Sequence, residues 1–165
     1  KHGRGGAAAL YGQMLTREVK PFIDRTYRTL PDPANTGLGG SSLGGLVTLY
    51  LGMLHPDIFG KLAVLSPSVW WDNRVILKLV RMVDPKPRLQ IWLDIGTGEG
   101  GKHVPNARAL RDEVIKAGWV LGAHLVYAEI PDAGHSEAAW AGRVGPLLEY
   151  LFPAHKPEDP LRLNL

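Results

Sequence analysis

A serine flanked by glycines is the first feature of this sequence that could carry out chemistry. The segment Gly40-Ser41-Ser42-Leu43-Gly44 matches the pattern G-x-S-x-G between two short apolar runs. Such a pattern marks a sharp turn that exposes the serine hydroxyl above a sheet, and flanking side chains would collide, so Gly40 and Gly44 must both be glycine. The backbone N–H of Leu43 would begin a helix and face a developing oxyanion. The pattern therefore predicts Ser42 as a nucleophile and Leu43 as an oxyanion donor.

A serine hydroxyl is a weak nucleophile without a general base, and His135 is the best-placed candidate. It lies in the segment IPDAGHSE, directly after the last predicted strand. One class of serine hydrolases has its catalytic residues in the chain order serine, acid, histidine, which His135 satisfies. Of the other histidines, His2 and His155 lie in the terminal segments, His55 at a helix end, His124 at the start of a strand and His103 beside a candidate acid. We therefore predict that His135 accepts the proton of Ser42.

The segment IWLDIGTGEGG offers two carboxylates for the acid that would orient the histidine. Asp94 lies inside a predicted strand, whereas Glu99 lies in the loop beyond it. Glu99 is the better placed, because only the loop reaches the height of the histidine, but Asp94 stays an alternative if the strand ends early. Asp132, close before His135, is more typical of a turn. The predicted catalytic set is thus Ser42, Glu99 and His135, with Asp94 as the other candidate acid.

Apolar periodicity and turn residues define the elements that must hold these side chains. Apolar residues recur at helical spacing over 8–28, with a bend expected at Pro21. Strands are predicted over 36–41, 61–67, 88–96 and 123–130, and the helices that follow them over 43–54, 73–83, 104–118 and 136–152. Pro146 should kink the last helix or start a new turn. Such alternation predicts an α/β fold, a parallel sheet with helices on both faces, and ligands bind at the carboxyl ends of its strands.

The composition predicts a single globular domain over 1–165 and excludes several functions. The chain has 165 residues, is 45% hydrophobic and 21% charged, and carries a formal net charge of +3 without a Lys/Arg run, which argues against nucleic acid. No apolar run reaches the ~18 residues of a membrane span. Without cysteine, disulfides, thiol nucleophiles and cysteine-based zinc sites are excluded. The lack of cysteine and of a signal peptide slightly favours the cytoplasm and leaves the location open.

The glycine-rich loop Gly96–Lys102 supports a rival interpretation, a phosphate-binding loop. It matches both G-x-G-x-x-G and G-x-x-x-x-G-K and stands between a predicted strand and a predicted helix. A nucleotide loop, however, needs Ser or Thr after the lysine, where this chain has His103, and Glu99 would place negative charge inside the anion cradle. Glu129 is too far along the chain to be a ribose-binding acid. Nucleotide binding is therefore one alternative function, and a catalytically inactive α/β module used for binding is another.

Four motifs resemble those of one family in their order along the chain and in their residues. They are GGSSLGG, HPDIFGKLAVLSPSVWW, IWLDIGTGEGG and GHSEAAW. From about Tyr11 to Phe152 the chain resembles the putative esterase family of the α/β-hydrolase superfamily, which includes enterochelin esterase-like and feruloyl esterase-like enzymes. The resemblance implies an α/β-hydrolase-type sheet and hydrolysis of a small-molecule carboxylic ester through an acyl-enzyme. It implies no metal and no organic cofactor.

The resemblance also implies roles for individual residues. By position, Ser42 is similar to the family's nucleophile, Glu99 to its acid and His135 to its base. Further positions resemble residues at the mouth of the substrate pocket, Ser68, Trp70 and Trp71, and a residue that packs beneath the histidine loop, Trp140. Trp70 and Trp71 would fit core aromatics under a loop equally well. The identity of the ester does not follow from these residues.

The chain departs from the family's pattern before its first helix, where family members carry several further strands. Those strands bring the second oxyanion donor and one wall of the pocket. We therefore expect a partial α/β-hydrolase domain in which the strand at 36–41 is an open edge, masked by another copy of the chain or by an upstream segment. Residues 153–165, which are proline-rich and charged, are expected to form a surface tail.

Overall fold

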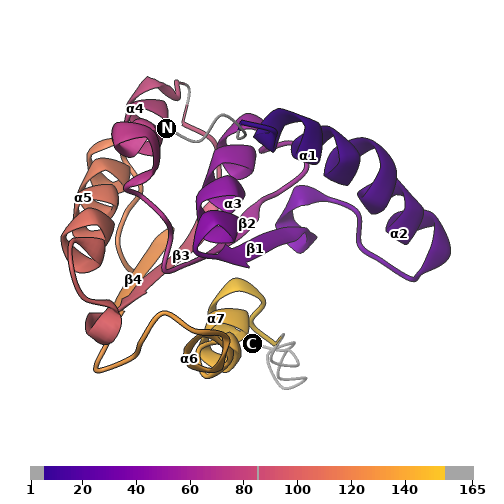
Figure 1. Ribbon diagram of the computed structural model, residues 1–165. Helices are drawn as coiled ribbons and strands as arrows, with labels where there is room; N and C mark the ends of the chain where they lie inside the picture. The colour runs from indigo at the N-terminus through magenta and orange to yellow at the C-terminus, as the bar shows by residue number, and fades with distance from the viewer. Residues whose placement is uncertain (1–5, 85, 155–165) are drawn as a thin grey trace, which may run out of the picture.

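The computed structural model describes residues 6–84 and 86–154, which contain a parallel sheet of four strands. The strands are β1 (Gly37–Ser41), β2 (Lys61–Leu65), β3 (Gln90–Gly96) and β4 (Leu125–Ile130). Their spatial order is β1-β2-β3-β4, and each pairs in parallel with its neighbour, so all carboxyl ends point the same way (Figure 1). The strand–helix alternation in the sequence predicted this sheet correctly.

Helices cover both faces of the sheet (Figure 1). One face carries α3 (Leu43–Leu54), α4 (Val75–Met82) and α5 (His103–Lys116). The other carries α6 (Glu137–Ala141) and α7 (Val144–Leu151). A 3₁₀ turn, Trp71–Arg74, precedes α4. The α/β fold expected from the sequence is therefore confirmed.

A proline reshapes the N-terminal helix. Instead of one bent helix over 8–28, the structure has α1 (Ala8–Met14), a π-helical stretch (Leu15–Val19) and α2 (Lys20–Thr26). Pro21 lies in the first turn of α2. Because proline has no N–H and its ring clashes with the carbonyl four residues earlier, the turn before it widens. The expected bend is thus a widened turn just before Pro21.

The last predicted helix breaks earlier than expected. Residues 136–152 divide at Gly142 and Arg143 into α6 and α7, so the new turn expected at Pro146 is present and begins at Val144. Pro146 lies in the first turn of α7, where its missing N–H would have no helical acceptor. The break makes Arg143 the N-cap residue of α7, and its side chain is buried towards the sheet.

Strand side chains alternate between two apolar layers. Facing α3, α4 and α5 are Leu62, Val64, Ile91 and Leu93, each at most 1% exposed. Those facing α7 include Ala63, Leu65 and Trp92, which pack on Leu147 and Leu151. Because successive side chains of a strand point to opposite faces, Asp94 lies on the same face as Trp92. Asp94 therefore points towards the layer of α6 and α7.

β1 forms an edge of the sheet. Within the described residues its only strand partner is β2, in agreement with the open edge expected from the sequence. The N-terminal helices border the same edge across a groove lined by Val19, Ile23 and Leu38. They carry the strongly exposed apolar side chains of Leu10 (68%) and Phe22 (55%), and Tyr27, directly after α2, is 62% exposed. This part of the surface is apolar and unpaired within the described residues.

Two expectations about the chain ends and membranes can be compared with the structure. Of the predicted surface tail, Pro153 and Ala154 are exposed, and 155–165 lie outside the described residues, as do His2 and His155. Among residues 6–84 and 86–154, none of the helices combines the length and apolarity that a membrane span requires.

Candidate active site

The turn between β1 and α3 has the backbone geometry of a nucleophile elbow. Ser42 adopts φ 57° and ψ −120°, which is strained for a residue with a side chain. A Cβ on Gly40 would lie 2.6 Å from the carbonyl carbon of Gly44, so no side chain fits there. A Cβ on Gly44 would meet nothing within 4 Å, so the expectation that this position also requires glycine is wrong. The second tight position is Gly45, whose Cβ would lie 2.9 Å from the carbonyl oxygen of Leu65.

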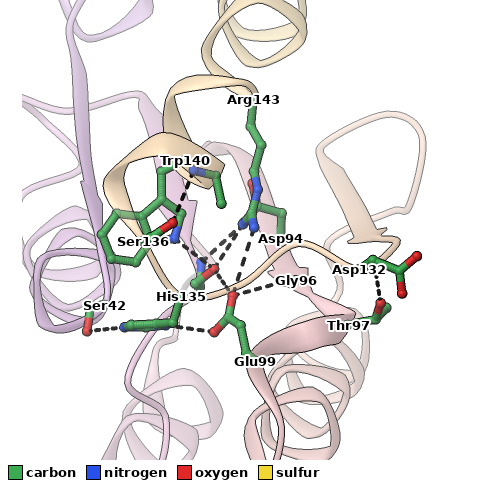
Figure 2. Close-up of polar contacts among 12 residues, drawn as sticks. Ser42, Asp94, Gly96, Thr97, Glu99, Asp132, His135, Ser136, Trp140 and Arg143 are labelled. Atoms are coloured by element: carbon green, nitrogen blue, oxygen red, sulfur yellow. Dashed lines mark hydrogen bonds and ion pairs between the residues drawn. The ribbon is translucent and has the colours of Figure 1, made fainter.

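The structure brings Ser42, His135 and Glu99 into one line of hydrogen bonds. Ser42 Oγ lies 2.9 Å from His135 Nε2, and His135 Nδ1 lies 2.7 Å from Glu99 Oε2 (Figure 2). The side chain of Glu99 is 0% exposed, whereas that of His135 is 33% exposed and can meet a ligand. The indole of Trp140 contacts the imidazole edge-on, with ring centroids 4.8 Å apart. This arrangement can move a proton from a serine hydroxyl to an imidazole held by a carboxylate.

Glu99 ends a 3₁₀ turn, Thr97–Glu99, that follows β3 directly. Its second oxygen, Oε1, accepts hydrogen bonds from the backbone N–H of Gly96 at 2.9 Å and from the hydroxyl of Ser66. Burial raises the pKa of Glu99, but the hydrogen bonds from Ser66 and His135 outweigh it and leave that pKa below its ordinary value. Glu99 is therefore held in place and kept ionised beside His135.

Asp94, the other candidate acid, lies below this line and has different partners. It is 0% exposed and accepts hydrogen bonds from Arg143 Nη1 at 2.7 Å, Trp92 Nε1 at 2.8 Å and the N–H of Ser66 at 3.2 Å. Burial raises the pKa of Asp94, against the lowering effects of Trp92 and Arg143. The structure thus brings Glu99, and not Asp94, to His135, because β3 extends past Asp94 as far as Gly96.

Ser66 and Arg143, which the sequence did not single out, connect Glu99 with Asp94. Ser66 Oγ accepts hydrogen bonds from Trp140 Nε1 at 3.1 Å and Arg143 Nη1 at 2.9 Å, and it donates to Glu99. Ser66 is 0% exposed and adopts φ 41°. Two features of the sequence could have identified them. Ser66 directly follows a buried strand. Asp94 lies in an apolar strand, and a buried carboxylate needs a cation such as Arg143.

Ser68 and Leu43 lie beside the serine. Ser68 Oγ is 3.2 Å from Ser42 Oγ, and the N–H of Ser68 donates to the carbonyl oxygen of Ser42 at 3.0 Å. Leu43 is the first residue of α3, so its N–H is one of the donors that a helix leaves unpaired within itself. Both groups are therefore close enough to contact a substrate held at Ser42.

The two tryptophans of the predicted pocket mouth have different surroundings. Trp70 is 49% exposed, which excludes a role as a core aromatic, and its ring centroid lies 5.9 Å from that of Trp71. Trp71 lines an apolar cavity of about 590 Å³, and Leu43 of the elbow lines the same cavity. A larger cavity of about 1130 Å³ includes Lys61 and Gln90, the first residues of β2 and β3, so it lies at the opposite end of the sheet.

The glycine-rich loop does not present its backbone as a free phosphate cradle. The N–H of Gly96 donates to Glu99, and the N–H of Gly98 donates to the carbonyl oxygen of Ala133 at 3.1 Å. The N–H of His103 donates to the carbonyl oxygen of Gly100 at 3.3 Å. These amides are already used, and a buried carboxylate occupies the place that an anion would need. The loop geometry therefore favours an acid-bearing loop over nucleotide binding.

Comparison with known proteins assigns the family. The sequence matches the family model described as "Putative esterase" over residues 1–148. The chain belongs to this family. The family and its characterised relatives are carboxylic ester hydrolases. The nucleotide-binding alternative finds no support in this match.

Individual relatives are considerably longer than this esterase-family chain. It is 29% identical over 97 residues to the uncharacterized protein YbbA of Bacillus subtilis, covering 58% of the chain and 38% of that protein. It is 25% identical over 159 residues to the iron(III) enterobactin esterase of Dickeya dadantii, covering 88% of the chain and 36% of that protein. The solved enterobactin esterase FES from Shigella flexneri, in the presence of enterobactin, matches with a TM-score of 0.77 and 24% identity, over 87% of this chain and 37% of that one. The structural likeness shows an α/β-hydrolase fold, and the chain spans less than half the length of each of these proteins.

Proposed function

We propose that the chain carries the catalytic residues of a serine carboxylic ester hydrolase that works through an acyl-enzyme. The observation that carries this proposal is the line of hydrogen bonds from Ser42 Oγ through His135 to the buried carboxylate of Glu99. The three side chains come from loops after different strands, yet their atoms lie at the distances that proton transfer requires. Membership of an esterase family supports the same class of reaction.

In the acylation step, Ser42 Oγ attacks the carbonyl carbon of the ester. His135 Nε2 takes the hydroxyl proton, and Glu99 stabilises the imidazolium through the hydrogen bond at Nδ1. The carbonyl oxygen becomes an oxyanion that accepts a hydrogen bond from the N–H of Leu43. The tetrahedral intermediate then collapses, the bond to the alcohol breaks, and His135 returns its proton to the leaving alkoxide.

In the deacylation step, His135 removes a proton from water while the water oxygen attacks the acyl carbon bound to Ser42. The carboxylic acid leaves and the proton returns to Ser42. For the substrate, we propose an ester that carries an aromatic group, because the exposed ring of Trp70, beside Trp71, offers a stacking surface. The solved enterobactin esterase FES in the presence of 2,3-dihydroxy-N-benzoyl-serine, a compound with an aromatic group, supports this class.

A fluorophosphonate probe and a series of nitrophenyl and feruloyl esters, with enterobactin, test the proposal. Wild-type chain should be labelled at Ser42, and Ser42→Ala should lose labelling and at least ~10³-fold of the ester turnover. Ser41→Ala is the matched control, since Ser41 is the last residue of β1 and the hydrogen bonds at His135 join it to Ser42 and Glu99. Unchanged labelling of Ser42→Ala would refute the assignment. An unlabelled wild type would instead favour a catalytically inactive binding module.

A further inference from the structure

A cluster of possible metal ligands surrounds the candidate base. Glu99, His103 and His135 each place one ligand atom within 4.8 Å of the other two. They come from three separate segments: the 3₁₀ turn after β3, the first residue of α5 and the loop after β4. The rings of His103 and His135 have centroids 5.7 Å apart. The proposed mechanism uses Glu99 and His135 but gives His103 no role.

The geometry points to a reversible inhibitory site for a divalent transition-metal ion, with zinc as the probe, formed by Glu99, His103 and His135. Two imidazoles and a carboxylate are a donor set that zinc binds well. A tetrahedral ion with ligands at about 2.1 Å keeps those ligands roughly 3.4 Å apart. The Nδ1–Oε2 pair at 2.7 Å must therefore open slightly, and His103 must approach. A rotation of His103 supplies that approach, because its side chain is only partly buried.

The surroundings of Glu99 favour a fixed ligand. Its Oε1 accepts hydrogen bonds from Ser66 and from the N–H of Gly96, which leaves Oε2 facing His135 and the cluster. Such hydrogen bonds behind a ligand fix its orientation and strengthen metal binding. The ring of Trp140 supports His135 from the side. Two of the three ligands are thus held before an ion arrives.

The consequence for catalysis follows from the two nitrogens of His135. A metal on Nδ1 needs the lone pair of that atom, so the ring proton leaves Nδ1 for water. The neutral imidazole then takes a proton from water on Nε2, the atom 2.9 Å from Ser42 Oγ. Nε2 becomes a donor and can no longer accept the serine proton. This inhibition rests on the proposed function, whereas metal binding itself does not.

Calorimetric titration of the full chain with zinc chloride tests the site directly. Wild type and Ser42→Ala should each bind one zinc ion. His103→Ala and Glu99→Gln should bind zinc with an affinity at least about tenfold lower than that of wild type. His124→Ala is the control, because His124 is an exposed histidine outside the cluster. Thermal unfolding checks that each variant folds, and His103→Gln replaces His103→Ala if the latter does not. Equal affinity in wild type and His103→Ala would overturn the site.

Fluorophosphonate labelling tests the inhibition. Zinc should slow labelling of wild type, and EDTA should restore it. His103→Ala should be labelled at the wild-type rate without zinc and should be much less sensitive to zinc. Zinc binding at the cluster without slower labelling would overturn the inhibitory role. A wild type that binds zinc but is never labelled would contradict the proposed function and leave the metal site supported.

Discussion

Arg143 forms a buried ion pair with Asp94 directly below the candidate active site. Arg143 Nη1 lies 2.7 Å from Asp94 Oδ1, and the two side chains are 3% and 0% exposed. The same nitrogen donates to Ser66 Oγ at 2.9 Å, and Ser66 in turn donates to Glu99. A charge pair in the layer beneath the sheet's carboxyl end therefore helps to hold the carboxylate that contacts His135.

Neutralising Glu99 should mainly affect ester turnover, whereas neutralising Asp94 should mainly affect stability. Glu99→Gln should lower ester turnover strongly with little loss of stability, because its amide cannot stabilise the imidazolium of His135. Asp94→Asn should instead lower the free energy of unfolding by about 3–5 kcal/mol, since the guanidinium of Arg143 would stay buried without its counter-charge. Urea unfolding and ester kinetics on both variants separate the effects. A folded Asp94→Asn with the larger loss of turnover would make Asp94 the catalytic acid.

The stability of the protein should depend on pH through Glu99. Its folded-state pKa lies below the ordinary value of 4.5, so its contribution is complete above that value and is lost as the pH falls through the folded-state pKa. Ser66→Ala removes a hydrogen bond that lowers this pKa, so less stability should be lost in acid. Urea unfolding at pH 7 and at steps below pH ~4.5 measures the difference. Glu99→Gln, which cannot titrate, is the control. An acid loss equal in wild type and Glu99→Gln would contradict the prediction.

The two glycines of the elbow pattern should differ in their tolerance of a side chain. Gly40→Ala should destabilise the fold by about 1–3 kcal/mol, because its Cβ would lie 2.6 Å from the backbone of Gly44. Gly44→Ala should be neutral or stabilising by up to ~1 kcal/mol, because it lies in α3 with open space around its Cβ. Thermal unfolding of both variants decides, and equal destabilisation would show that the turn moves as a unit.

The open edge should make the chain on its own self-associate. β1 has a single strand partner among the described residues. Phe22 of α2 is 55% exposed, and Tyr27, directly after α2, is 62% exposed. Phe22→Glu with Tyr27→Glu should shift light scattering towards monomer, whereas Met82→Glu, 79% exposed on α4, should not. A wild-type chain that is already a monodisperse monomer would contradict the expectation.

The sequence by itself determined the features that depend on short stretches of chain. Strand–helix alternation predicted the parallel sheet, and the glycine turn followed by an apolar run predicted α3 with its observed bounds, Leu43–Leu54. The position of Ser42 at the turn follows from the same short segment, because a tight turn, a helix start and an apolar periodicity are local properties. A local rule failed at Gly44, where the outcome depends on neighbouring segments.

Only the tertiary structure decided which distant side chains meet. Glu99 reaches His135 and Asp94 does not because β3 runs on to Gly96, so alternation turns Asp94 into the layer of Arg143. Ser66 hydrogen-bonds to Glu99, which is 33 positions later in the sequence, and to Arg143, which is 77 positions later. Such long-range contacts depend on how the parallel strands are arranged and on where α7 crosses the sheet. The spacing of residue types along the chain predicts neither arrangement.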